Sequence, residues 1–201
     1  MYPGMPEMIG RDLIKIDTVR SDIVIAGGNN TVKDELWDIY DENKQLTGRT
    51  MKRNDWNMQP GDYHLTVLGV VRHVDGRYLI TRRVMTKSWA PGWWEVSGGG
   101  VMAGEDSRTA VLREVREEIG LDVSGWEGGY LFSYRRDNPE EKDNYFVDIY
   151  RFTGEFTEQD LHLQAEETDG WMLADLEQIR EFAKQGIFLH YDSMKAAFEE
   201  V

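Results

Sequence analysis

One stretch of this sequence combines a glycine-rich loop with an amphipathic helix. Val111, Val115 and Ile119 recur every four residues, which predicts a helix over 106–119 with one buried face. Gly120 follows directly, and glycine often ends a helix because it adopts the left-handed cap conformation without steric strain. The glycines just before the helix predict a tight loop. Any fold proposed for this chain must therefore accommodate a loop, a helix and a second loop in succession.

Three glutamates lie on the predicted helix away from its apolar stripe. Glu114 and Glu118 are one turn apart and Glu117 lies between them, so the three carboxylates share one side of the helix. Their mutual repulsion favours a bound cation, and oxygen ligands are preferred by Mg²⁺ and Mn²⁺, which in turn attract phosphate oxygens. Alternating arginine and glutamate is also typical of a solvated surface helix. The helix alone is compatible with either interpretation.

The spacing of the surrounding residues favours the metal site. The residues at fixed intervals are Gly99, Glu105, Arg113, Glu114, Glu117, Glu118 and Gly120. Position for position, this stretch resembles the Nudix box. The resemblance implies an α/β protein with the Nudix α/β/α sandwich, in which a central mixed β-sheet carries a catalytic loop-helix-loop. It also implies hydrolysis of a diphosphate bond by water attack at phosphorus, with Mg²⁺ or Mn²⁺ as cofactor.

The resemblance assigns metal ligands within the box. It implies that Glu114, Glu117 and Glu118 hold the metal, together with the Gly99 carbonyl and with Glu105 as an outer ligand. We expect replacement of Glu118 by glutamine to stop turnover almost completely.

Two further roles concern support and proton transfer. Arg113 is expected to hold a neighbouring carboxylate in place, such as Glu117 four residues on. Glu117 is the first candidate for the base that takes a proton from water. Glu166 and Glu167 in a later loop are rivals for that role, and a solvated acidic turn is the alternative interpretation of the pair.

Beyond the box, the sequence from about residue 34 to residue 185 is similar to the branch of the Nudix group that resembles isopentenyl diphosphate isomerase. The similarity is carried by Trp37-Asp38-Ile39-Tyr40-Asp41-Glu42, Leu46-Thr47-Gly48, Tyr63-His64-Leu65, Ile80-Thr81-Arg82-Arg83, Lys87 and Trp89-Ala90-Pro91-Gly92-Trp93-Trp94-Glu95. The catalytic cysteine of the isomerases falls on Gly98, a metal-binding histidine falls on Gly100, and their downstream acidic pair falls on Asp143 and Tyr145. Because the chain has no cysteine, isomerisation is disfavoured.

The same similarity suggests how a substrate is held. Arg83 and Lys87 match isomerase positions that grip the diphosphate, and a bidentate guanidinium beside an ammonium suits that task. Adjacent side chains of a strand point to opposite faces, so only one of Arg82 and Arg83 should face the site. Trp89 is the candidate for stacking on a substrate ring, although tryptophans here also suit the core.

Composition limits the partners. The formal charge of −14 argues against binding of a nucleic acid polymer or an anionic membrane surface, because a protein that binds such anions needs clusters of basic residues and none is visible in this sequence. It leaves room for a small phosphorylated substrate, since bound cations can reverse the local field. Without cysteines, an apolar signal sequence or a transmembrane stretch, the sequence predicts a cytoplasmic protein.

The remaining patterns predict the framework of the fold. Residues 64–73 and 77–84 are β-rich and flank the hairpin signal Asp75-Gly76, and 130–134 with 145–152 predict a second strand pair. Helices are predicted over 174–184 and 191–199. We expect a Nudix domain over 34–201.

Residues 1–33 form an N-terminal extension in which 13–16 and 23–26 could pair as a hairpin. An edge strand, a contact in a homodimer, and disorder of the first dozen residues are the roles considered for this extension. Three functions remain open for the whole chain: a metal-dependent diphosphate hydrolase acting on a nucleoside diphosphate-linked or related small substrate, an isomerase-like enzyme, and a non-catalytic sensor of a phosphorylated ligand.

Overall fold

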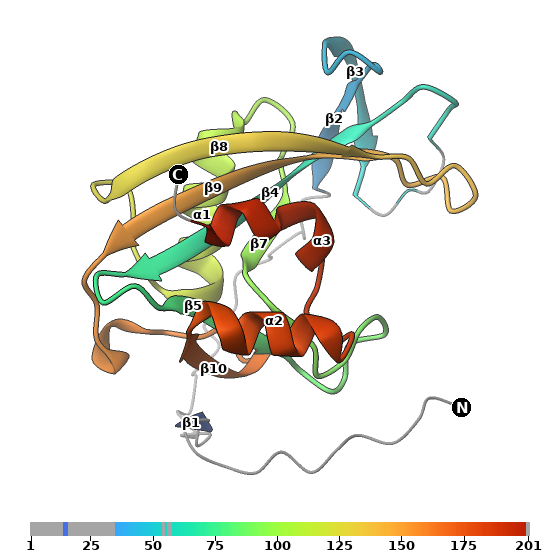
Figure 1. The fold of residues 1–201 in the computed structure, drawn as a ribbon. Helices are drawn as coiled ribbons and strands as arrows, with labels where there is room; N and C mark the ends of the chain where they lie inside the picture. Colours follow the sequence, from blue (N-terminus) through green and yellow to red (C-terminus); the bar gives the residue numbers. More distant parts are fainter. Residues whose placement is uncertain (1–13, 16–34, 54, 56–57, 200–201) are drawn as a thin grey trace, which may run out of the picture.

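The computed structural model describes residues 14–15, 35–53, 55 and 58–199. Within them, an eight-stranded mixed sheet is covered by helices on both faces (Figure 1). Its strands are β1 (Ile14–Lys15), β4 (His64–His73), β5 (Tyr78–Arg83), β6 (Trp94–Glu95), β7 (Ser97–Gly100), β8 (Glu127–Arg136), β9 (Tyr145–Gly154) and β10 (Thr168–Ala174). A smaller sheet pairs β2 (Leu36–Tyr40) with β3 (Leu46–Lys52). The helices are α1 (Ser107–Ile119), α2 (Leu176–Lys184) and α3 (Tyr191–Met194), with 3-10 turns η1 (Glu158–Asp160) and η2 (Lys195–Phe198).

The main sheet runs in the order β1, β10, β5, β4, β9, β8, with β6 added to β5 and β7 added to β4. Strands β4 and β9 are parallel, whereas β4 pairs antiparallel with β5 and β7. The predicted central sheet of mixed direction is therefore confirmed. Because β7 lies directly beside β4, the glycines that begin the predicted catalytic loop are fixed at the middle of the sheet.

Strand β4 shows why the core has two halves. Leu65 and Val67 belong to one buried cluster, which contains the apolar stripe of α1. Leu68 and Val70 belong to the other, which includes residues of α2, α3 and η2. A strand covered on both faces is expected to be apolar nearly throughout, as this one is. In Figure 1, α1 lies behind the sheet and α2 and α3 lie in front of it.

Helix α1 begins and ends as its sequence predicts. The Asp106 side chain caps it by accepting from the Thr109 N–H at 2.7 Å, so the helix starts one residue after the cap. Gly120 has φ 83° and its N–H donates to the Arg116 carbonyl, which satisfies an unpaired carbonyl of the last turn. The predicted apolar stripe is buried against the sheet.

The other predicted elements are found with shifted ends. The second predicted strand pair extends to β8 and β9, which are ten residues each. Helix α2 begins later than expected because Asp175 forms a capping box with Gln178, which leaves Ala174 in β10. The predicted last helix is a short α3 followed by η2. In the described part of the chain, no helix is long and apolar enough to cross a membrane.

Part of the N-terminal extension lies at an edge of the sheet. Residues Ile14 and Lys15 form β1, which pairs antiparallel with Trp171 and Gly170 of β10. The predicted partner segment 23–26 lies outside the described residues. The hairpin and the domain boundary at residue 33 therefore stay predictions.

Candidate active site

The acidic side of α1 lies against β7 at very close range. A Cβ atom built on Gly99 would lie 2.4 Å from Glu114 Oε1, so a larger residue at this position would push this carboxylate aside. The Gly98 N–H donates to Glu118 Oε2 at 3.2 Å. The glycines of β7 therefore allow two carboxylates of the helix to reach the backbone of the sheet.

Glu118 lies at the centre of a group of acidic side chains. Burial raises its pKa well above the usual value for glutamate, and the charges of Glu95, Glu114 and Glu167 raise the pKa further. These four residues come from α1, β6 and the loop before β10. A protein that gathers carboxylates in a partly buried place meets a cost in repulsion and desolvation, which a bound cation would remove.

Glu95 is a site residue to which the sequence assigned no role, although it ends the segment 89–95 that resembles the isomerase branch. It pairs in register with Thr81 of β5, and burial raises its pKa while the charge and hydrogen bond of Arg83 oppose that shift. The signal that could have revealed it is an acidic residue on a strand between Trp94 and Val96, both of which are fully or almost fully buried.

Arg113 connects the acidic residues of the box. Its guanidinium donates to both oxygens of Glu105, at 3.0 and 2.9 Å, to Glu114 Oε1 at 2.7 Å and to Glu117 Oε2 at 3.2 Å. It also donates to the Gly100 carbonyl at 3.2 Å. The structure thus places Arg113 beside the neighbour that the sequence suggested, and it adds two closer carboxylate partners.

The carboxylates gathered around Glu118 are the kind of oxygen ligand that a hard divalent cation prefers. Among the described residues, no three side chains of the types His, Cys, Asp and Glu are arranged so as to hold an ion. Glu114 and Glu117 are bonded to Arg113 instead. The space that Gly99 leaves at the Glu114 carboxylate supports the fit, since a larger residue there would displace this carboxylate.

The cations expected to bind substrate lie beside these carboxylates. Arg83 donates to both oxygens of Glu95, at 3.2 and 3.0 Å, and Lys87 forms an ion pair with Glu167. Arg82 instead donates to Asp169 at 2.7 Å. Of the two adjacent arginines, the structure therefore brings Arg83 into the acidic group.

Trp89 adjoins Arg83 at the edge of this group. The Arg83 guanidinium carbon lies 5.5 Å from the centre of the Trp89 ring, and Arg83 Nη2 donates to the Trp89 carbonyl at 3.2 Å. The indole is 54% exposed, which is unusual for so large an apolar side chain. It is therefore open to contact with a ligand.

The loop before β10 reaches the site because it is bonded to the end of α1. The Gln164 N–H donates to the Glu118 carbonyl at 3.0 Å. Of the two rival bases in this loop, Glu166 is exposed whereas Glu167 is half-buried. Only Glu167 acts on the pKa of Glu118, so the structure brings Glu167 into the acidic group and leaves Glu166 in solvent.

Comparison with known proteins identifies the family of this chain. The family model described as NUDIX domain matches residues 62–195, which is more than half of the chain. The chain belongs to the Nudix family. An uncharacterized Nudix hydrolase of Listeria monocytogenes is 30% identical over 167 residues, covering 82% of this chain and 94% of the relative. The predicted enzyme class, a Nudix pyrophosphohydrolase, is confirmed at this level.

More distant Nudix proteins are similar over smaller parts or in fold alone. An RNA pyrophosphohydrolase of Sphingopyxis alaskensis is 29% identical over 127 residues, which cover 52% of this chain and 73% of that protein. The crystal structure of DR0079 from Deinococcus radiodurans superposes with a TM-score of 0.60 at 22% identity, over 75% of this chain and 90% of that one. The Nudix α/β/α fold predicted from the sequence is thereby confirmed.

Proposed function

We propose that this Nudix protein is a divalent-cation-dependent hydrolase that cleaves the diphosphate bond of a nucleoside diphosphate-linked or related small phosphorylated substrate. The observation that carries the proposal is the convergence of acidic side chains on Glu118 beside two cations, Arg83 and Lys87. Carboxylates that hold metal and cations that hold phosphate are the two components that such a reaction requires.

The box residues would hold the cation. Glu114, Glu117 and Glu118 would supply carboxylate oxygens, with the Gly99 carbonyl beside them and Glu105 as an outer ligand. A cation bound there would lower the pKa of water and neutralise charge on the leaving phosphate. Arg113 acts as a positioning residue, because it contacts Glu105 and two of these ligands and limits their movement.

Proton transfer and substrate binding fall to the residues around the box. Arg83 and Lys87 bind the diphosphate, and Trp89 contacts the group attached to it. Lys87 is paired with Glu167 in the structure. When a diphosphate oxygen takes Lys87 as its partner, Glu167 Oε is left free to accept a proton from water. Glu117, which is more than half exposed, is the other candidate base.

The isomerase alternative is opposed by backbone packing as well as by the missing cysteine. A Cβ on Gly98, at the position of the isomerase cysteine, would lie 2.3 Å from the Val67 carbonyl oxygen. A Cβ on Gly100, at the position of the isomerase histidine, would lie 2.5 Å from Trp37 Nε1. Neither position of this chain accepts a side chain without rearrangement.

The test is release of phosphate or nucleoside monophosphate from a panel of nucleoside triphosphates, dinucleotides, nucleotide sugars, prenyl diphosphates and a short RNA with a 5′-triphosphate. RNA is included because one relative is an RNA pyrophosphohydrolase. We expect cleavage of a small member of the panel with Mg²⁺ or Mn²⁺ and none with chelator. Saturable binding of one member without turnover of any would contradict the hydrolase and support the non-catalytic sensor of a phosphorylated ligand.

A further inference from the structure

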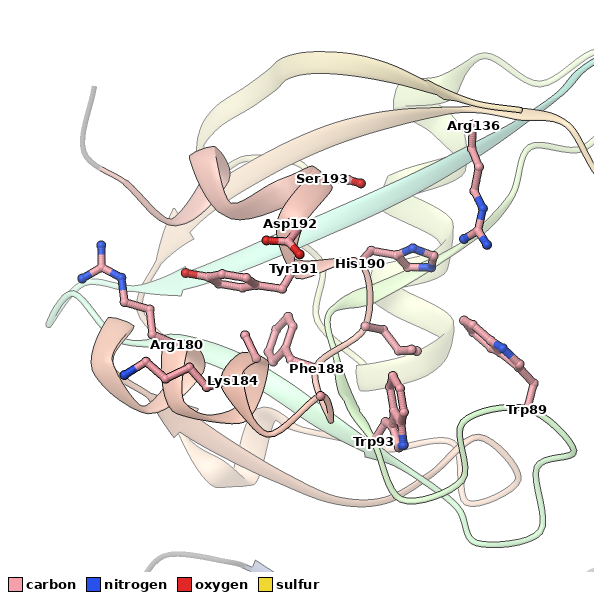
Figure 2. A pocket seen from close by; sticks show the side chains of 13 residues that line it. Trp89, Trp93, Arg136, Arg180, Lys184, Phe188, His190, Tyr191, Asp192 and Ser193 are labelled. Carbon is pink, nitrogen blue, oxygen red and sulfur yellow. The ribbon is translucent and has the colours of Figure 1, made fainter. Parts of the chain in front are cut away.

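A pocket of about 630 Å³ opens beside Trp89 (Figure 2). We call it the aromatic pocket. The lining residues that Figure 2 labels are Trp89, Trp93, Arg136, Arg180, Lys184, Phe188, His190, Tyr191, Asp192 and Ser193. They come from the loop between β5 and β6, the end of β8, helix α2, and the segment from Phe188 into α3. Its volume is within the range that holds a ligand of nucleotide size.

The aromatic pocket shares a wall with the proposed diphosphate site. Trp89 lines the pocket, and Arg83, which holds Glu95, packs on the Trp89 ring. On the pocket side, the His190 ring lies 6.0 Å from the Trp89 ring. A diphosphate bound at Arg83 would therefore carry its attached group directly into this pocket.

The charge of the lining is opposite to that of the protein. Three lining residues, Arg136, Arg180 and Lys184, are cations, whereas Asp192 is the one acidic residue among those that line the pocket, in a chain with a formal charge of −14. The nearest ion pairs of Arg180 and Lys184 are 4.0 and 3.7 Å long and exposed, so they neutralise these cations only weakly. The pocket therefore attracts anions.

Arg136 is the cation best placed for a ligand. Its guanidinium donates to the Tyr145 hydroxyl at 3.0 Å and lies over that ring, and among the described residues no ion pair joins it to a carboxylate. Figure 2 shows it extending toward His190 and Trp89. Burial and then the charges of Arg136 and Arg83 lower the pKa of His190 to about 4, so His190 is neutral at pH 7 and does not repel this guanidinium.

The walls of the pocket suit a flat ring. Four of its lining residues carry aromatic side chains besides His190: Trp89, Trp93, Phe188 and Tyr191. Stacking on such rings is favourable for any planar group. A purely aliphatic group would also bury apolar area here, but it would offer neither a face for stacking nor a negative charge to Arg136.

We infer that the aromatic pocket binds the non-reacting part of the substrate, and that this part is a planar aromatic group bearing a negative charge in addition to the diphosphate. The inference deepens the proposed function and rests on it, because the diphosphate site at Arg83 determines which end of the substrate enters the pocket. Arg136 is the specificity-determining residue for the added charge, and Trp89 stacks on the ring.

Binding without turnover tests this inference. The probes are the 3′,5′-bisphosphates of adenosine and uridine, the matching 5′-monophosphates, and isopentenyl monophosphate as an aliphatic probe, each titrated calorimetrically with chelator present. For at least one of the two bases we expect the bisphosphate to bind about tenfold or more tightly than its monophosphate, because one charge-assisted contact is added. Isopentenyl monophosphate should bind most weakly.

Variants identify the residues responsible. Arg136→Gln should reduce the preference for the bisphosphate to less than about threefold and leave the monophosphate little changed. Trp89→Leu should weaken both nucleotides by about tenfold. Arg135→Gln is the matched control, because Arg135 precedes Arg136 on β8 but pairs with Asp137 and does not line the pocket; it should bind like the unaltered protein.

The outcomes separate this inference from the proposed function. Equal binding of bisphosphate and monophosphate for both bases, or a preference that survives in Arg136→Gln, overturns the inference even if metal-dependent cleavage is found. A preference that is lost in Arg136→Gln and kept in Arg135→Gln supports the anion site even if the panel shows no turnover, in which case the hydrolase proposal fails alone.

Discussion

The carboxylate site and the aromatic pocket meet at Trp89, which lines the pocket and packs against Arg83, yet their electrostatics are opposite. Around Glu118, burial and neighbouring carboxylates raise the pKa of an acid. In the pocket, burial and neighbouring guanidinium groups lower the pKa of His190. Each region resists further charge of the sign that it already carries. The first is therefore suited to a cation and the second to an anion, which is the division expected for a metal-bound diphosphate with a charged attached group.

A large loss of rate is expected when the general base, the group that takes a proton from the attacking water, is removed from the carboxylate site. Glu117 belongs to the box, whereas Glu167 belongs to the loop that pairs with Lys87. We expect Glu167→Gln to lower the maximal rate by roughly 10²–10⁴, because the carboxylate released by Lys87 would be lost.

Steady-state rates of Glu167→Gln and Glu166→Gln form a matched pair, since Glu166 is the exposed neighbour. If Glu117→Gln shows the large rate loss while Glu167→Gln keeps its rate and metal affinity, the base lies on the helix.

A smaller effect is expected from one added methyl group. In Gly99→Ala the new Cβ meets the carboxylate of Glu114, which is the end of a flexible side chain and can move away. We expect a loss of about 10–100-fold in metal affinity or turnover, as for other changes in the residues that orient a metal ligand, with little change in thermal stability.

Gly125→Ala is the control, because a Cβ on Gly125 would meet nothing within 4 Å. An active Gly99→Ala protein with unchanged metal affinity would show that the close contact of β7 with Glu114 has no role in the site.

The smallest predicted effect concerns the aromatic pocket, where His190 makes the free energy of unfolding depend on pH. His190 has a pKa of about 4 in the fold and about 6.5 when unfolded. The unfolded chain therefore binds more protons between these values, and this residue lowers the free energy of unfolding as the pH falls from about 6.5 to about 4.

His190→Asn should reduce that loss by on the order of 2 kcal/mol, and asparagine tolerates the backbone φ of 57° found at this position. Denaturant unfolding of both proteins at pH 7 and pH 4.5 measures the difference. An identical pH dependence in the two proteins would contradict the neutral state of His190.

The same two regions show what a sequence can predict. The apolar stripe of α1, its cap at Gly120 and the spacing of the box lie within one continuous segment, so periodicity and motif were sufficient. The β-rich runs and the Asp75-Gly76 turn likewise predicted the central strands, because a hairpin depends on local residues.

Features made by distant segments were not predicted. Glu95 joins the site only because β6 pairs with β5, and Arg113 binds Glu105 through the fold of a loop. The aromatic pocket is assembled from segments about 100 residues apart, from Trp89 to Ser193. Of its lining, the sequence singled out Trp89 alone for substrate contact, because spacing along the chain does not reveal which strand ends and helices meet.

The most direct test of the account is a Mn²⁺ titration followed by turnover measurements in Glu118→Gln, with Glu127→Gln as a control on the exposed start of β8. The half-buried carboxylate of Glu118 is central to the proposed metal site. We predict that Glu118→Gln folds, binds Mn²⁺ far more weakly and has almost no turnover, while Glu127→Gln matches the unaltered protein. Full turnover and unchanged Mn²⁺ affinity in Glu118→Gln would contradict the account.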